Sequence, residues 1–270
     1  MSFLVQIFNA VLRTHLFTTV LKHAQVISNL KPGEDPALPS SYRPISLSDT
    51  IGKILLARIQ FEVRERGLMR DEQFGFRIRH STPLQLARHI ERITRSFGEK
   101  RLTGAVFLDV AKVFDTDWIN GLLYKLTILY FLSYLVHTIS SYLRGRTFEE
   151  SFRCPCNLVA ACRLGWRRVF ISLVLFSLCV NDIPTPPNHV ELAICTDDMT
   201  IIATSRKPTL LVSYLESYLN DLQRWLSEWR TTINVSKSTT IIFVRARRCF
   251  IQPRPVTLFV EPIQWVETTR

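Results

Sequence analysis

Apolar and polar residues recur along the chain with helical and extended periods, and each period predicts an element of secondary structure. A helical period predicts helices over residues 3–28 and 51–66 and a long amphipathic helix over 208–229. Ser81-Thr82-Pro83 supplies a capping hydroxyl followed by a proline, which predicts another helix start. The helical period predicts three further helices, over residues 118–130, 134–143 and 171–181. Alternation predicts strands over residues 147–153 and 239–244.

Acidic residues stand at the ends of two apolar strand candidates. The run of residues 105–108 ends on Asp109, and Thr196-Asp197-Asp198 lies between the apolar runs 192–194 and 199–202. Two apolar strands around such a tip predict a β-hairpin with the acids at its turn. If the strand that ends at Asp109 lies beside this hairpin, three carboxylates converge and repel one another.

Divalent metal ions would relieve this repulsion. Carboxylate oxygens suit hard Mg²⁺, which proteins bind through one or two carboxylates together with substrate phosphates, and Mn²⁺ is the alternative cation. Two such ions about 4 Å apart are the arrangement that polymerases use for in-line phosphoryl transfer. The pattern therefore predicts a phosphoryl-transfer site, whereas Asp109 taken alone would be a strand-end acid or a helix cap.

The helix predicted after Ser81 carries an apolar and a basic stripe. We expect its buried stripe to consist of Leu86, Ile90, Ile93 and Phe97. The basic stripe consists of Arg88, Arg92 and Arg95. A solvated surface is the ordinary interpretation of such arginines, but further basic residues on both sides of the helix favour phosphate contact.

The composition of the chain indicates which class of binding partner it has. The 270 residues carry a net charge of +11, with a pI of about 9.7, which favours nucleic acid first and an anionic membrane surface second. A merely basic protein is the alternative. The chain is 47% apolar, enough for a sizeable core, and no run reaches the ~20 apolar residues of a membrane span, so we expect no membrane partner. Six cysteines in a chain of this length indicate a reducing, intracellular setting rather than a disulfide framework.

Several longer motifs follow one another in a fixed order. They are Ser41–Leu47, Asp71–Arg77, His80–Thr82, Ala105–Val110 with Phe114-Asp115, Trp118 with Gly121–Leu126, Thr196–Asp198 and Ile233–Ser238. In this order and spacing they resemble the reverse transcriptase domain of jockey-like non-LTR (LINE-type) retrotransposons.

The resemblance implies an α+β right-hand polymerase fold. We expect fingers and a palm, with an antiparallel palm sheet packed on helices, and a thumb that is largely missing. Residues 1–36 would form an N-terminal helical extension, and residues 37–270 a C-terminally truncated reverse transcriptase domain.

The implied activity is that of an RNA-directed DNA polymerase, which adds dNTPs to the 3′-end of a DNA primer on an RNA template. The implied location is nuclear at the site of action. The sequence indicates no oligomeric state.

The resemblance also assigns roles to acidic residues. Asp109 and Asp197 match the direct metal ligands of the family, with Asp198 close by as the third acid. The backbone carbonyl of Val110 matches a further metal contact.

Three other residues match positions that handle the nucleotide. Phe114 matches an aromatic gate that excludes a ribose 2′-hydroxyl, with a core phenylalanine as the alternative. Arg77 matches the fingers residue that grips the triphosphate, and a planar, permanently charged donor suits that role. Lys237 matches a lysine near the leaving pyrophosphate, where it could donate a proton or neutralise charge. Taken alone, Arg77 and Lys237 would be ordinary surface residues.

One segment departs from the family pattern. The family carries Gly-x-x-Gln-Gly between its two acidic motifs, where this chain has residues 161–168, Ala-Cys-Arg-Leu-Gly-Trp-Arg-Arg. One choice of synonymous codons for residues 154–169, read two nucleotides later, encodes Gly-Val-Ala-Gln-Gly at this place. We therefore hypothesise two compensating frameshifts, which the coding DNA would reveal. A copy so altered could be inactive, and the alternative function is a non-catalytic nucleic-acid-binding remnant or a pseudogene product.

Overall fold

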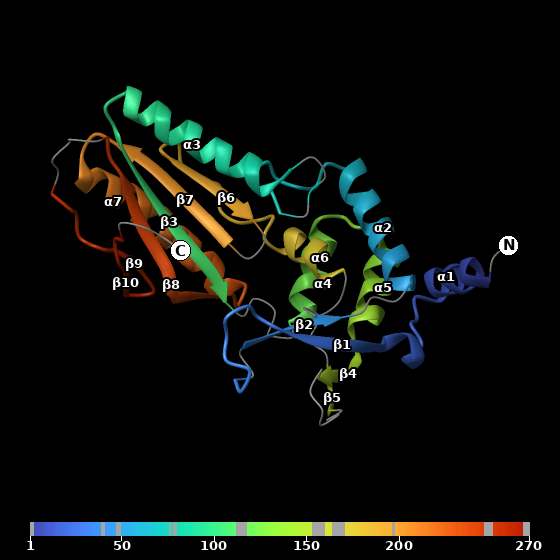
Figure 1. Cartoon of the computed structure of the whole chain (residues 1–270). Helices are drawn as coiled ribbons and strands as arrows, with labels where there is room; N and C mark the ends of the chain where they lie inside the picture. The colour runs from blue at the N-terminus through green and yellow to red at the C-terminus, as the bar shows by residue number, and fades with distance from the viewer. Residues whose placement is uncertain are drawn as a thin grey trace. The chain divides into compact units, whose positions relative to one another are not determined.

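The computed structural model describes residues 3–38, 41–46, 50–75, 77, 80–111, 118–152, 160–163, 171–195, 198–245 and 251–266. The chain divides into two compact units (Figure 1). Unit 1 comprises residues 1–69 and 114–179, and unit 2 comprises residues 70–113 and 180–270. Because Asp109, Asp198 and Lys237 all belong to unit 2, this unit holds the candidate site.

Unit 1 combines helices with a four-stranded sheet in the order β2-β1-β4-β5. Its helices are α1 (Phe3–Thr14), η1 (Thr19–Lys22), α2 (Thr50–Glu65), α4 (Ile119–Ile128), α5 (Ser133–Leu143) and α6 (Ser172–Cys179). Its strands are β1 (His23–Leu30), β2 (Tyr42–Ser46), β4 (Thr147–Phe152) and β5 (Ala160–Arg163). The helices predicted over 51–66, 118–130, 134–143 and 171–181 are confirmed, each within a few residues, as is the strand predicted over 147–153.

The helix predicted over residues 3–28 is wrong in its second half. The helix ends at Thr14, and residues 23–30 form the strand β1. This strand pairs antiparallel with β2 and parallel with β4, which lies more than a hundred residues later in the chain. A partner so distant in sequence leaves no mark in the local period, so tertiary pairing overrides it. The predicted domain boundary at residue 36 stays a prediction.

Unit 2 is built on a second four-stranded sheet, in the order β6-β7-β3-β8, in which every neighbouring pair is antiparallel (Figure 1). Its strands are β3 (Leu102–Ala111), β6 (Val190–Cys195), β7 (Asp198–Ser205) and β8 (Thr232–Phe243). The helices are α3 (Thr82–Gly98) and α7 (Pro208–Glu228), and a small hairpin of β9 (Val256–Leu258) and β10 (Glu261–Ile263) follows. The predicted hairpin is confirmed in its two strands, which pair as far as Cys195 and Asp198, whereas Thr196 and Asp197 of its predicted tip lie outside the described residues. The predicted helix over 208–229 is confirmed.

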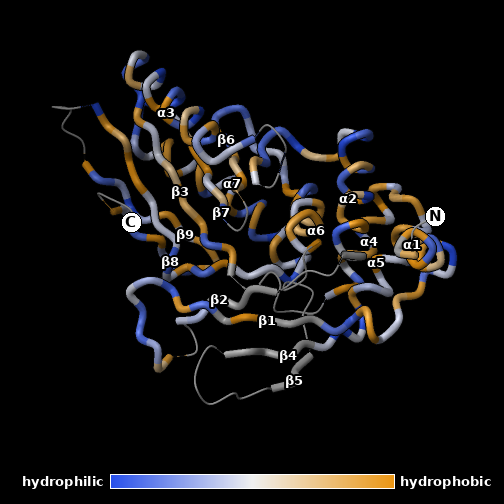
Figure 2. The backbone as a smooth tube through the Cα atoms, turned by 45° about the vertical axis from the view of Figure 1, so that its right-hand side comes forward, coloured by the Kyte–Doolittle hydropathy of each residue, from blue (hydrophilic) through white to orange (hydrophobic). Residues whose placement is uncertain are grey.

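The amphipathic helix α7 covers one face of this sheet. A Cβ atom on Gly104 of β3 would lie 3.0 Å from Leu211 Cδ2, so the backbones of strand and helix approach closely at this glycine. Val106 and Leu108 share its face of the strand and are fully buried. Figure 2 shows the apolar stretches of the chain running through the central strands of unit 2 and through α6. Burial against α7 explains why β3 is so apolar.

The helix α3 packs with a face about a quarter turn from the predicted stripe, of which Ile93 and Phe97 are half-buried. Leu86 and Ile90 are 57% and 55% exposed, whereas Gln85 and Ser96 are buried. Arg92 forms an ion pair with Glu191 of β6 at 3.2 Å and donates a hydrogen bond to Thr204 at 3.5 Å. These polar partners on the sheet hold the polar face of the helix inward.

The start of α3 is confirmed, because Ser81 Oγ accepts a hydrogen bond from the amide of Leu84 at 3.4 Å. In the part of the chain that the structure describes, no helix is both long and apolar enough to cross a membrane.

Candidate active site

Two of the predicted acids lie directly opposite each other on neighbouring strands. Asp109 of β3 pairs with Asp198 of β7, at the end of a continuous antiparallel register that begins with Leu102 and Ser205. Directly opposite residues of an antiparallel pair point to the same face, with Cβ atoms about 5 Å apart. The fold therefore brings two carboxylates together from positions 89 residues apart (109 to 198) in the chain.

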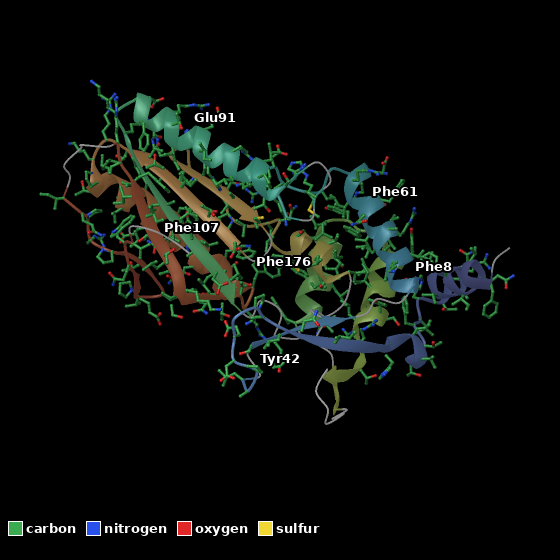
Figure 3. All side chains as sticks on the ribbon, viewed as in Figure 1. Phe8, Tyr42, Phe61, Glu91, Phe107 and Phe176 are labelled. Carbon is green, nitrogen blue, oxygen red and sulfur yellow. The ribbon has the colours of Figure 1, made fainter. Side chains whose placement is uncertain are left out.

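These acids stand on the face that does not pack on α7. Thr103, Ala105 and Phe107 lie on the same face of β3 as Asp109, because side chains alternate along a strand. Thr103 and Ala105 are completely buried, and Phe107 is half-buried. The side chain of Asp109 is 33% exposed and Asp198 is exposed. Figure 3 labels Phe107, two residues before Asp109 on the same strand. The cover over this face thus ends before the acid pair, which remains accessible to a ligand.

The electrostatics of the pair favour a cation. Two like charges directly opposite on adjacent strands destabilise a sheet. The ammonium of Lys237 lies 3.9 Å from Asp109 Oδ2, and its own side chain is 71% exposed. An ion pair this exposed contributes little stability, so Lys237 compensates the acids only in part.

A bulge in β8 brings Lys237 to this place. Phe107 pairs with Thr239 but Asp109 pairs with Asn234, so residues 235–238 of β8 lie opposite Leu108 alone. In the bulge, Ser238 Oγ donates a hydrogen bond to Asn234 O at 2.9 Å and accepts one from the amide of Asp109 at 3.4 Å. The sequence motif Ile233–Ser238 therefore contains the whole bulged segment 235–238.

The segment before α3 extends the sheet beside β6. The amide of Phe74 donates to Ile194 O at 2.9 Å, and the amide of Ile194 donates to Glu72 O at 2.8 Å. Burial raises the pKa of Glu72, but the hydrogen bond and the charge of Arg70 outweigh it and leave this pKa below its usual value. Since Ile194 pairs with Met199, the residue after Asp198, this segment supports the hairpin beside that acid.

Arg77 lies just after this segment and contacts it. Its Nη1 donates to Arg70 O at 2.8 Å, and its Nη2 lies 3.5 Å from Asp71 Oδ1. No described contact joins Arg77 to Asp109 or Asp198, so its predicted grip on a triphosphate stays a prediction.

The structure describes only some of the remaining predicted site residues. Asp197 and Phe114 lie outside the described residues, as do residues 164–168 of the departing segment. Val110 belongs to β3, where it pairs with Ile233 and its side chain is buried. Within the described ranges, which omit Asp197, no group of three His, Cys, Asp or Glu side chains is arranged to hold a metal ion.

The structure changes the predicted role of Arg92 and gives a role to Ser238. Arg92, one of the basic stripe expected to contact phosphate, is committed to Glu191 and Thr204 inside unit 2. Ser238, by contrast, contacts the backbone of Asp109, a role that the sequence did not indicate. Its only signal was its place at the end of the motif Ile233–Ser238, just before the predicted strand over 239–244.

The donor set fits a hard divalent cation. Asp109 and Asp198 offer carboxylate oxygens on one accessible face, and Asp197 adjoins Asp198 in the chain. Such oxygens suit Mg²⁺ and similar ions. With such a cation held by the acids, the cation and the nearby ammonium of Lys237 would neutralise phosphate groups.

Known proteins resemble this chain in sequence. Residues 29–260 match the family model described as reverse transcriptase (RNA-dependent DNA polymerase). The chain is 32% identical, over 89% of its length, to the Drosophila melanogaster protein named Probable RNA-directed DNA polymerase from transposon BS. It is 31% identical, over 91% of its length, to the RNA-directed DNA polymerase from mobile element jockey of Drosophila funebris. The chain spans 28% of the length of each of these relatives.

Solved structures show the same fold. Apo telomerase from Candida tropicalis, truncated from its C-terminal domain, has a TM-score of 0.57 and 9% identity, covering 90% of this chain and 55% of that one. Telomerase of the same organism with a fragment of telomeric RNA has a TM-score of 0.56 and 10% identity, covering 94% of this chain and 46% of that one. The expected α+β polymerase fold, with an antiparallel sheet packed on helices, is thereby confirmed. The chain belongs to the reverse transcriptase (RNA-dependent DNA polymerase) family.

Proposed function

We propose that this chain is the polymerase domain of a non-LTR retrotransposon, which adds dNTPs to a DNA primer 3′-end on an RNA template. The observation that carries this proposal is the register that sets Asp109 opposite Asp198, with Lys237 3.9 Å from Asp109. Membership in the family implies binding of a nucleic-acid template and primer. The net charge of +11 supports that partner.

The reverse transcriptase family generally uses divalent metal ions. Here Asp109, Asp197 and Asp198 would hold them, and the carbonyl of Val110 would add a contact. We propose Mg²⁺, with Mn²⁺ as a substitute, because the donors are carboxylate oxygens. When bound, such ions activate the primer hydroxyl and stabilise the charge of the phosphates.

The chain's own residues would bind and orient the nucleotide. Lys237 stands beside the acid pair, where its ammonium can neutralise or protonate the leaving pyrophosphate. Arg77 would reach the triphosphate after leaving its contacts with residues 70 and 71. Phe114 would exclude a ribose 2′-hydroxyl.

Primer extension on poly(rA)/oligo(dT) with Mg²⁺ and dTTP tests this function. We expect incorporation by the parent chain and its loss in Asp198→Asn. Asp221→Asn is the matched control, because Asp221 lies on α7 and pairs with Arg224. Measurable incorporation that is equal in the parent and in Asp198→Asn would refute the proposal.

A second candidate function is nucleic-acid binding without polymerisation. The departing segment favours it, because Leu164 and Arg168 stand where the family motif has its two glycines, which would let the backbone approach a nucleotide. Loss of positioning alone can cost about 100-fold in rate. A variant with residues 164–168 replaced by Gly-Val-Ala-Gln-Gly separates the two functions. Activity gained only in that variant would assign binding to the present chain and polymerisation to the family.

A further inference from the structure

We infer that Ser238 is a positioning residue, which holds Asp109 and the Lys237 bulge in one arrangement through its hydroxyl. This inference rests on the proposed function, since it assigns Asp109 to the metal site. It adds a residue that touches neither the reacting groups nor the ion.

The need for such a residue arises from the bulge in β8. In a regular antiparallel ladder, backbone carbonyls accept the amide hydrogens of the neighbouring strand. Between Phe107 and Asp109 the register moves from Thr239 to Asn234, so the ladder is interrupted beside Asp109. A buried amide left without an acceptor is costly. The Ser238 hydroxyl takes this place, accepting from the Asp109 amide at 3.4 Å.

The same hydroxyl also closes the bulge. It donates to Asn234 O at 2.9 Å, across four residues of β8. Ser238 is only 6% exposed, so water competes poorly for either hydrogen bond. One buried group therefore fixes the backbone of Asp109 and both ends of the loop that carries Lys237.

Neighbouring residues show that this role is specific to Ser238. Ser236 lies in the same bulge and is exposed, and its hydroxyl contacts only the side chain of Asn234 within the described contacts, at 2.6 Å. Ser236→Ala therefore removes a hydroxyl from the bulge without touching Asp109 and is the matched control.

Two measurements test the inference. The first is Mn²⁺ affinity without nucleotide, followed by electron paramagnetic resonance at a temperature where all variants are folded. Residues that orient metal ligands change metal affinity by about 10–100-fold when removed, so we expect about tenfold weaker binding in Ser238→Ala. Ser238→Thr keeps a hydroxyl and should restore the affinity, and Ser236→Ala should match the parent. Ser238→Cys, similar in size but a weak acceptor, should lose affinity if Ser238→Ala fails to fold.

The second measurement is hydrogen exchange of the Asp109 amide in the metal-free chain, which should be faster in Ser238→Ala than in Ser236→Ala. Parent-like Mn²⁺ affinity in Ser238→Ala and Ser238→Cys would overturn the inference while leaving the polymerase proposal intact. Failure of the parent chain to bind Mn²⁺ would overturn both.

Discussion

At the scale of single residues, substitution of Lys237 should lower catalysis without lowering the stability of the fold. Its side chain is 71% exposed, so its loss should change the melting temperature little. Its place beside Asp109 predicts a decrease of about 100-fold in kcat for Lys237→Ala, from lost proton donation or charge neutralisation. Single-turnover incorporation measures this change. Arg245→Ala removes another exposed cation of unit 2 and should keep the parental rate; an equal loss in both variants would assign the effect to net charge.

The sequence predicted which residues meet at the site but not how. The apolar runs before Asp109 and around Asp198 predicted strands with acids at one end but left open whether these strands are neighbours, and the structure pairs Asp109 with Asp198. The contact of Ser238 with Asp109 could not be predicted, because it depends on a register change between strands far apart in sequence. The roles predicted for Asp197 and Phe114 stay predictions, because both residues lie outside the described part of the chain.

At the scale of elements, the β9–β10 hairpin carries backbone strain. Glu261 pairs with Leu258, so its turn consists of Phe259 and Val260, with φ values of 50° and 68°. Two-residue turns with both φ values positive favour Asn-Gly, and a branched side chain in this region costs about 1–2 kcal/mol. Because Val260 is 93% exposed, Val260→Gly loses no packing. It should raise the free energy of unfolding by up to about 1 kcal/mol, after the larger unfolded-state entropy of glycine is subtracted.

The control for this strain is Val20→Gly in η1. Val20 is also exposed, at 83%, but the structure gives it no positive φ. This variant should be no more stable than the parent in thermal unfolding. Stabilisation by both substitutions, or by neither, would contradict strain at the turn.

The polar inner face of α3 predicts a pH dependence. Burial first, and the charge of Arg88 second, hold the pKa of His89 below its usual value, against a smaller opposing effect of Glu191. The unfolded chain therefore binds a proton more readily than the folded chain. Stability is full above the unfolded pKa of about 6.5 and declines as the pH falls through it. Urea unfolding at pH 7, 6 and 5 should show this decline, and His89→Gln should reduce it. An unchanged decline in the variant would place its cause elsewhere.

Helices could be predicted where residues close together in the sequence determine them. The capping serine and the following proline fixed the start of α3, and the helical period fixed α7. The same period placed the wrong face of α3 inward, because it measures apolarity alone and the sheet beneath offers Glu191 and Thr204 as polar partners. Strand β1 was missed because its partner β4 is remote in the chain.

At the scale of the whole molecule, the net charge of +11 predicts salt-dependent binding of nucleic acid. Lysine and arginine contacts to phosphates release counterions, so affinity for single-stranded RNA should fall linearly on a logarithmic plot against salt. Asp198→Asn should bind RNA at least as tightly as the parent, since it removes a negative charge. Fluorescence anisotropy measures the slope of this plot between about 50 and 200 mM salt, a range over which the affinity of such proteins for nucleic acid falls strongly. A slope of zero would exclude the phosphate backbone as the partner.

The central claim is that Asp109 and Asp198 act as one site, and a double-mutant cycle on primer extension tests it most directly. Groups that act as a unit are strongly non-additive. Asp109→Asn and Asp198→Asn should each lower the Mg²⁺-dependent incorporation rate by at least about 1,000-fold, and the double variant should be no slower than the worse single variant. Losses that multiply in the double variant, or an incorporation rate that neither substitution changes, would contradict a shared active site.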